Sequence, residues 1–244
     1  MKQRSASPKL DKIWRLYQFD AQLRCILKPY LDIVELHART KIAYSFALEK
    51  CRESPHDQHY DSANFYNKES HDSIISSLGR EKIYNKDSLF VIHHTKKYGG
   101  KMPIWALVEL LSFTNLSKLY SAMYNSEQEK IAGNMGSTRQ ILKNHLHCMA
   151  NLRNKVAHAG RLYNVSYNPP VMLGRKYLRD APDIRPNTLF AYLVALLRRL
   201  PNKEDRSALV MTIINVIIQY SDCIELPFLG FPDEYIVRLC NEIR

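Results

Sequence analysis

The amino-acid sequence predicts an all-α fold, a helical bundle with additional helices and one short irregular segment. Apolar residues recur at steps of three and four along most of the 244 residues, which is the periodicity of amphipathic helices. Only 8 glycines are present, so a sheet-rich fold with many tight turns is disfavoured. Capping residues and Gly or Pro stop signals separate the apolar runs. We therefore expect helices joined by loops.

The N-terminal part is expected to form a lead, two helices and a loop. Residues 1–8 are polar and should be flexible. Residues 9–52 have helical periodicity, but Pro29 lacks the amide hydrogen that a helix interior requires, so it should divide this stretch in two. A polar loop should follow over residues 53–70, with Phe65 or Tyr66 as an ordered aromatic anchor.

Four further helices are expected between residues 70 and 134. They cover approximately residues 70–84, 86–97, 104–124 and 127–134. Gly99 and Gly100 provide a stop signal after the second of them. Pro103 stands near the first turn of the third, where its missing amide hydrogen is harmless.

The next helix should cover about residues 139–159, capped by Ser137 or Thr138. Gly160 follows, where a residue without a Cβ can end the helix in a left-handed conformation. Residues 161–186 contain four prolines and should be irregular, with room for a short hairpin. A C-terminal helical subregion should cover residues 187–244, with helices at 187–200 and 204–220 and a last one from about Asp233. We expect residues 9–244 to form a single domain.

Composition favours a basic protein of the cytoplasm. The formal net charge of +11 favours anionic partners such as nucleic acid. The 5 cysteines are odd in number and form no C-x-x-C pair, which indicates reduced thiols. The N-terminus has no apolar leader, and no apolar stretch is long enough to span a bilayer, so we expect no membrane partner.

The candidate chemistry lies in residues 151–164, NLRNKVAHAGRLYN. Arg153 and His158 suit phosphodiester chemistry, because imidazole can move a proton near neutral pH and guanidinium can hold a phosphate. Asn154 shares a helix face with His158, while Lys155 and Arg161 add positive charge. RNA carries its own nucleophile, the 2′-hydroxyl, so this reaction needs neither metal nor cofactor.

Two further expectations concern ligands. Tyr163, beside the motif, is a candidate for stacking on a base. The paired histidines elsewhere in the chain lack a structural zinc spacing with four good ligands, so no metal site is expected.

The spacing of Arg153 and His158 is by itself a weak signal. A histidine in a last helical turn often only caps the helix, and a helical arginine usually forms a surface ion pair. The residues alone leave three functions open: a ribonuclease, a non-catalytic RNA-binding or regulatory module, and a structural helical domain that mediates dimerisation.

Four stretches carry a resemblance to a known family. RNKVAHAGRLYN resembles the signature of Abi-type abortive-infection proteins, the AbiD/AbiF-like group of the HEPN superfamily. Three others match the same family in the same order: LYQFDAQLRCILKPYLDIVELHARTKIAY at residues 16–44, IWALVELLSFTNLSKLY at 104–120, and LGFP at 229–232. The match therefore runs from about Leu16 to Pro232.

The resemblance implies an all-helical HEPN core and metal-independent endoribonuclease activity. It further implies a homodimer whose composite site holds two Arg and two His, and phage defence through growth arrest. Some relatives are toxins that an RNA or protein antitoxin neutralises. A non-catalytic HEPN module that binds RNA or regulates remains the alternative.

Residue roles follow from the same resemblance. Arg153 would stabilise the scissile phosphate, His158 would be the general acid or base, and Asn154 would orient His158 or the phosphate. Arg161 and Asn164 match motif positions that are candidate RNA contacts. Further matches fit either a functional role or a structural ion-pair network; they are Glu35, Arg39 and Glu109.

Within the matching stretches, the chain departs from the family pattern at two positions. Ala159 stands where many relatives have a second histidine, so any role of that histidine is lost. Thr114 replaces a glycine of the family motif.

Overall fold

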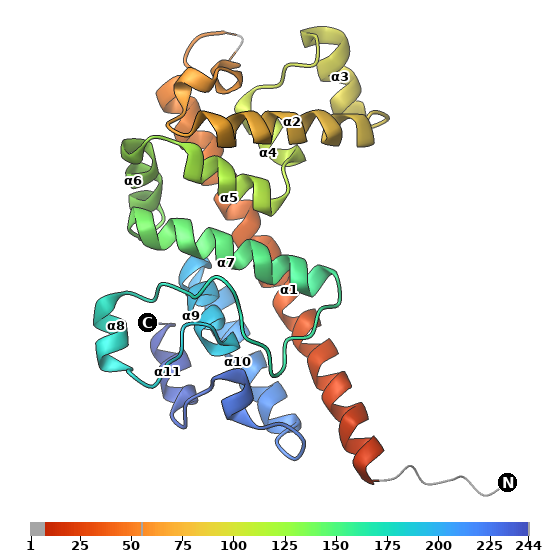
Figure 1. Ribbon diagram of the computed structural model, residues 1–244, viewed down its shortest axis with the longest axis vertical. Helices are drawn as coiled ribbons and strands as arrows, with labels where there is room; N and C mark the ends of the chain where they lie inside the picture. Colours follow the sequence, from red (N-terminus) through yellow and green to blue (C-terminus); the bar gives the residue numbers. More distant parts are fainter. Residues whose placement is uncertain (1–7, 55, 244) are drawn as a thin grey trace, which may run out of the picture. The chain divides into compact units, whose positions relative to one another are not determined.

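The computed structural model describes residues 8–54 and 56–243, and its architecture confirms the all-α prediction (Figure 1). These residues form α-helices and three short 3₁₀ helices, and none of them lies in a β-strand. Apart from Pro8, the expected flexible lead lies outside the described residues. No described helix is long and apolar enough to cross a membrane.

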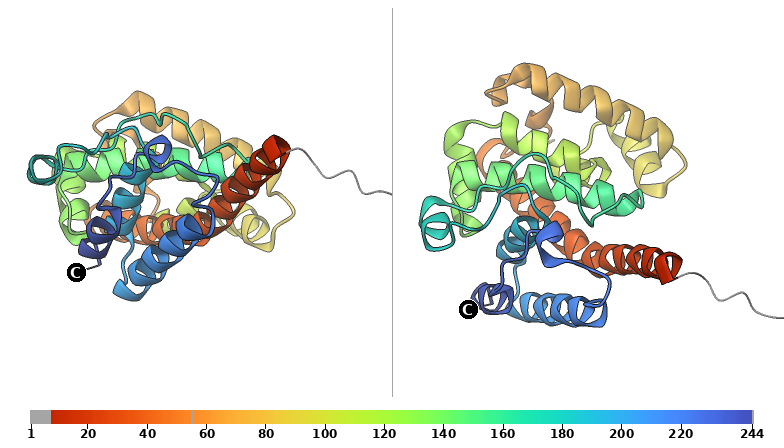
Figure 2. Two further views of the ribbon diagram at one scale, coloured as in Figure 1. Left: turned by 90° about the horizontal axis from the view of Figure 1, so that it is seen from below. Right: turned by 60° about the horizontal axis from the view of Figure 1, so that its bottom comes forward.

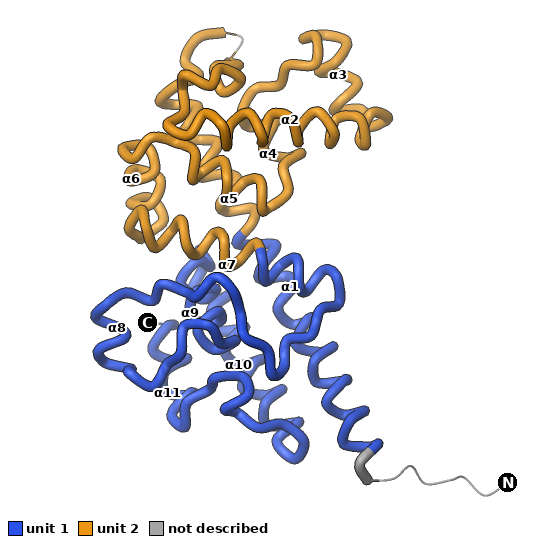
Figure 3. The backbone as a smooth tube through the Cα atoms, viewed as in Figure 1, with its two compact units in different colours: residues 1–34, 151–244 blue, residues 35–150 orange. Residues whose placement is uncertain are grey.

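The chain divides into two compact units (Figure 3). Unit 1 comprises Met1–Val34 and Asn151–Arg244, and unit 2 comprises Glu35–Ala150. Two helices, α1 (Pro8–Lys50) and α7 (Arg139–Ala157), contribute residues to both units. Because α1 and the end of α7 share unit 1, residues far apart in the sequence meet there.

Helix α1 is continuous through Pro29, so the prediction of two helices was wrong. Because Pro29 has no amide hydrogen, the carbonyl of Cys25 one turn earlier receives no hydrogen bond from it. Both residues are exposed, so water can hydrate that carbonyl. Buried side chains recur at steps of three and four before and after the proline, and packing therefore holds both halves in helical register. They are Phe19, Leu23, Leu27, Leu31, Val34, Ala38, Ile42 and Phe46.

Unit 2 contains the next helices, visible in two further views in Figure 2. They are η1 (Gln58–Tyr60), η2 (Ser62–Asn64), α2 (Lys68–Tyr84), α3 (Leu89–Tyr98), α4 (Ile104–Leu110), α5 (Phe113–Ala122) and α6 (Asn125–Asn134). Helix α2 packs against α4 and α5. Phe65 is the predicted anchor of the loop before α2: it is fully buried and stacks on Phe46, with ring centroids 5.1 Å apart.

The long helix expected over residues 104–124 is instead two helices, α4 and α5. Leu111 and Ser112 between them have extended backbones. The Ser112 hydroxyl accepts a hydrogen bond from the amide of Asn115 at 3.2 Å, which caps α5. The capping serine therefore starts a new helix where apolar periodicity alone suggested continuation.

Unit 1 is completed by the C-terminal helices α8 (Arg175–Asp180), α9 (Leu189–Arg199), α10 (Lys203–Gln219), η3 (Leu226–Leu229) and α11 (Tyr235–Asn241). Every residue of α9 from Leu189 to Leu197 is buried, as expected of a central helix that is apolar on all sides. The stretch expected to be irregular contains α8, and its described residues form no hairpin.

Candidate functional site

The end of α7 is a Schellman motif, a tight helix terminus closed by two backbone hydrogen bonds. The amide of Gly160 donates to the carbonyl of Lys155 at 2.7 Å, and the amide of Ala159 donates to that of Val156 at 3.3 Å. The left-handed residue is Ala159, with φ of 53°, so the prediction that Gly160 takes this conformation was wrong. Gly160 is required for another reason: a Cβ there would lie 2.7 Å from Lys155 Cγ.

His158 is the cap residue of this terminus and its side chain is exposed. Its amide donates a hydrogen bond to the carbonyl of Asn154 at 3.0 Å, which closes the last regular turn of the helix. Asn154 therefore lies directly below His158 on one face, as expected from their spacing. The motif presents the imidazole at a fixed helix end, open to solvent.

Arg153 and Lys155 are half-buried in the same turn of α7. Arg153 and His158 are five positions apart in the sequence, which places their Cα atoms about 140° apart around the helix. Lys155 is held over an aromatic ring, with its ammonium 5.9 Å from the centroid of Tyr167. Within one chain, Arg153 and His158 thus leave the helix in different directions.

The loop after α7 is fastened to α1 by a buried carboxylate. Asp20 is 6% exposed, and its Oδ1 accepts hydrogen bonds from the amides of Leu162 at 2.7 Å and Tyr163 at 2.8 Å. Its other oxygen, Oδ2, pairs with Arg24, whose guanidinium also reaches the carbonyl of Gly160 at 3.4 Å. This charge-assisted cluster holds the loop in place immediately after His158.

Tyr163 is part of the same packed region. Its ring is half-buried and forms edge contacts with Phe19 at 6.0 Å and Phe228 at 5.9 Å between centroids. Its hydroxyl accepts a hydrogen bond from the amide of Glu225 at 3.0 Å, and burial raises its pKa. Tyr163 therefore anchors the loop, and only part of its ring is available to a base.

Asn164 and Arg161 are the more accessible of the predicted RNA contacts. Both side chains are exposed, and Asn164 has a left-handed backbone with φ of 51°. Asn164 lines a cavity of about 190 Å³ together with Arg185 and Phe228. The cavity adds a cationic and an aromatic side chain to the region after the motif.

Three residues of this site were not singled out from the sequence: Asp20, Arg24 and Arg185. Asp20 and Arg24 carry a recognisable signal, because a carboxylate and a guanidinium four residues apart on a largely apolar helix face form a pair. The amide that Asp20 binds could not be predicted from the sequence, since Leu162 lies 142 residues away in the chain. Arg185 lies within the proline-rich stretch and carries no pattern.

Glu35 and Arg39, which also match the family pattern, form an ion pair in unit 2. The same guanidinium donates to the carbonyl of Val108 at the end of α4. This is the structural network that the sequence left open as an alternative, while Glu109 is exposed on α4. Among the residues described by the structure, no group of three or more His, Cys, Asp or Glu side chains is placed to hold a metal ion.

Comparison with known proteins adds one result to this geometry. No curated protein and no solved structure matches the chain. The sequence model of a family described as Abi-like protein matches residues 3–164, a range that includes both the Asp20 cluster and the complete motif around His158. Because the match covers well over half of the chain, this protein belongs to the Abi-like protein family, and membership supports a role in phage resistance by abortive infection.

Proposed function

We propose that the protein is a metal-independent endoribonuclease of the AbiD/AbiF-like group in the HEPN superfamily, acting in phage defence as a toxin. The observation that carries the proposal is the closed terminus of α7, where the imidazole of His158 is exposed and basic residues stand before and after it in the sequence. A buried carboxylate fixes the loop directly behind it. Such pre-positioning is what acid–base catalysis on a flexible RNA strand requires.

In this proposal the chain supplies proton transfer and charge stabilisation. The 2′-oxygen of a ribose attacks the adjacent phosphorus, and the bond from phosphorus to the 5′-oxygen breaks. His158 moves the proton, either from the 2′-hydroxyl or to the 5′-oxygen, and Arg153 stabilises charge on the phosphate. Asn154 orients His158, because the two share one helix face. The products are a 2′,3′-cyclic phosphate and a 5′-hydroxyl.

RNA binding would rest on the side chains around this terminus. Lys155 and Arg161 would contact the backbone phosphates. The exposed edge of Tyr163 and the amide of Asn164 would contact a base or ribose. Arg185, which lines the same cavity as Asn164, joins this group.

We also propose that the protein acts as a homodimer in the cytoplasm. Arg153 and His158 leave α7 about 140° apart, so a phosphate is held between them more readily if each comes from a different protomer. A toxin of this kind would be held inactive by an antitoxin, either RNA or protein.

The different directions in which Arg153 and His158 leave α7 also support a second candidate function, a module that binds RNA without cutting it. If Arg153 serves only to bind RNA, the basic terminus would retain RNA while His158 acts as an ordinary helix cap. This candidate requires no composite site.

The deciding experiment compares His158→Ala with His147→Ala, an exposed histidine on the same helix. Purified protein is incubated with total RNA in the presence of a chelator, and the ends of the products are identified. Loss of a general acid or base should reduce cleavage by about 100-fold or more, with RNA retention unchanged, whereas His147→Ala should cleave normally. Cleavage that persists in His158→Ala would refute the nuclease proposal, and retention without products in the wild type would favour the second candidate.

A further inference from the structure

Unit 2 contains a second candidate site that the proposed function does not use. It is a cavity of about 490 Å³, a size typical of small-molecule sites. His56 and Asp57 line it from the segment before η1, Trp105 lines it from α4, and His93, His94 and Tyr98 line it from α3. All of these residues lie in unit 2, whereas the motif around His158 belongs to unit 1.

Two large aromatic rings of this cavity face solvent. Trp105 is 50% exposed and Tyr98 is 45% exposed, although side chains of this type normally bury most of their surface. His56 lies against Trp105 with ring centroids 5.7 Å apart, and His93 lies against Tyr98 at 5.8 Å. Exposed, supported ring faces inside a cavity are suited to stacking against a planar ligand.

The imidazoles supply hydrogen-bond acceptors to the same space. His56 Nδ1 lies 2.7 Å from the carbonyl of Cys51, and His94 Nδ1 lies 2.9 Å from that of Phe90. Because a carbonyl only accepts, each Nδ1 carries a proton, and the neutral form of each ring offers Nε2 as an acceptor. His56 is held in a left-handed conformation with φ of 62°, the kind of strain that recurs at binding sites.

One cationic side chain lines the same cavity, and a second lies against a ring that lines it. Lys101 lines it and pairs with Asp57 at 2.7 Å while remaining largely exposed. The ammonium of Lys97 lies 5.4 Å from the centroid of Tyr98. A planar ligand with amino donors and an attached anion would satisfy the stacking faces, the acceptors and the ammonium groups together.

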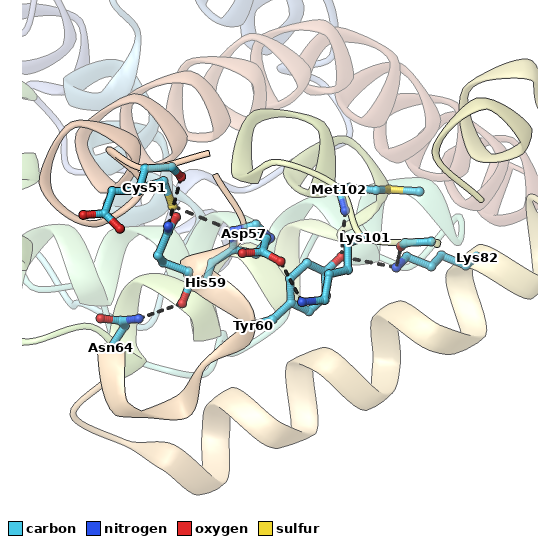
Figure 4. A network of polar contacts seen from close by, with 11 residues as sticks. Cys51, Asp57, His59, Tyr60, Asn64, Lys82, Lys101 and Met102 are labelled. Atoms are coloured by element: carbon cyan, nitrogen blue, oxygen red, sulfur yellow. Dashed lines mark hydrogen bonds and ion pairs between the residues drawn. The ribbon is translucent and has the colours of Figure 1, made fainter. Parts of the chain in front are cut away.

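A polar network anchors the segment that carries Lys101 and Met102, two residues that line the cavity (Figure 4). The Tyr60 hydroxyl accepts hydrogen bonds from the amide of Met102 and from Lys82 Nζ, both at 3.2 Å. Lys82 also donates to the carbonyl of Gly100. The segment that carries Lys101 and Met102 is therefore anchored to η1 and α2, and the site is formed before a ligand arrives.

We propose that this cavity is a nucleotide-binding site. The base stacks on Trp105 and Tyr98, its amino group donates to a histidine Nε2, and the phosphate lies against Lys97 and Lys101. The ligand is either a free nucleotide or one nucleotide of a single-stranded RNA, since both present the same chemistry. The site acts independently of the chemistry proposed for His158.

The test uses the full chain and calorimetric titration with adenosine 5′-monophosphate, adenosine and a short oligoadenylate. The Trp105→Ala variant is compared with Trp14→Ala, which removes a similarly exposed tryptophan from α1. Loss of the stacking face should weaken binding of the nucleotide or the oligonucleotide at least about ten-fold, and Trp105→Tyr should restore most of it. Trp14→Ala should bind like the wild type.

The phosphate contact is tested with Lys97→Ala against Lys118→Ala, an exposed lysine on α5. Lys97→Ala should weaken the nucleotide but not adenosine, while Lys118→Ala should change neither. Binding of the oligonucleotide alone, sensitive to Trp105, would identify an RNA strand as the source. Absence of binding to all three probes, or binding that Trp105→Ala leaves unchanged, would overturn the proposal. His158→Ala should bind the nucleotide normally, so this outcome is separable from the ribonuclease test.

Discussion

At the scale of single residues, the left-handed conformation that the sequence predicts for Gly160 is found at Ala159. The left-handed backbone falls on alanine, with φ of 53°, a conformation that is unfavourable for a residue with a Cβ. Glycine falls on the next position, where a Cβ would lie 3.0 Å from the carbonyl oxygen of Lys155. The helix terminus at His158 therefore requires a close approach of Gly160 to Lys155 and tolerates backbone strain at Ala159.

This arrangement predicts opposite effects of two small substitutions. Gly160→Ala should lower the free energy of unfolding by about 1–3 kcal/mol, because the new methyl group overpacks against Lys155. Ala159→Gly should raise it by up to about 1 kcal/mol, because strain is relieved. Denaturant unfolding of both variants measures these changes. Equal destabilisation by the two would contradict the Schellman geometry.

The buried imidazole of His59 makes the free energy of unfolding depend on pH. Burial lowers its pKa from 6.5 to about 4, so the folded state keeps the ring neutral while the unfolded chain takes up a proton below pH 6.5. The stability that this contributes is fully present above pH 6.5 and is lost as the pH falls toward 4, by about 3 kcal/mol in total.

The measurement is thermal unfolding between pH 7.5 and 4.5 for the wild type and His59→Gln. The wild type should lose stability more steeply than the variant over this interval, because glutamine does not titrate. Identical slopes would show that His59 is not the group responsible.

At the scale of elements, α1 and the loop after α7 form one functional assembly within unit 1. Two family motifs that are far apart in the sequence meet here, since Asp20 and Arg24 belong to one and Leu162 and Tyr163 to the other. The geometry gives a physical reason for their occurrence in one chain: the first motif holds the loop that follows the catalytic candidate.

The assembly predicts a large difference between two ion pairs of identical spacing on α1. Asp20→Ala removes the acceptor of two amides and leaves the half-buried Arg24 without its carboxylate partner, which should cost about 3–5 kcal/mol. The control is Lys28→Ala, which breaks the exposed pair of Lys28 with Asp32 and should cost at most about 0.5 kcal/mol.

Denaturant unfolding gives the two stabilities, and RNA cleavage below the unfolding transition gives the functional effect. Asp20→Ala should also reduce cleavage, because the loop beside His158 is released. Similar stability losses in the two variants would contradict the tethering role of Asp20.

At the scale of the whole molecule, the net charge of +11 favours association with RNA. Charge of one sign opposes self-association at long range, so a dimer has to be stabilised by close contacts. The proposed composite site requires such a dimer, which makes oligomeric state a direct consequence of the ribonuclease proposal.

The dimer proposal predicts a solution mass twice the chain's 28.4 kDa, with cleavage that falls on dilution together with the dimer. Mixing Arg153→Ala with His158→Ala should restore part of the activity, because a mixed dimer contains one intact Arg and one intact His at the shared site. Light scattering and cleavage assays test both points. Full activity in a monomer would contradict the composite site.

Much of the local structure could be predicted because it depends on neighbours in the sequence. Apolar periodicity and capping residues located the main helices, including α7 to within two residues of its end. The departures occur where two local signals compete. Apolar periodicity suggested one helix where Ser112 caps a second, and Pro29 suggested a break where packing on both sides keeps α1 continuous.

By itself, the sequence determined the all-α class, the position of the motif and the basic character of the chain, since each follows from residue type and spacing. The tertiary structure alone decided that Asp20 holds the loop beyond His158 and that a cavity forms around Trp105. The physical reason is that these features depend on contacts between residues separated by tens to more than a hundred positions. No local pattern encodes which distant amide a carboxylate will meet.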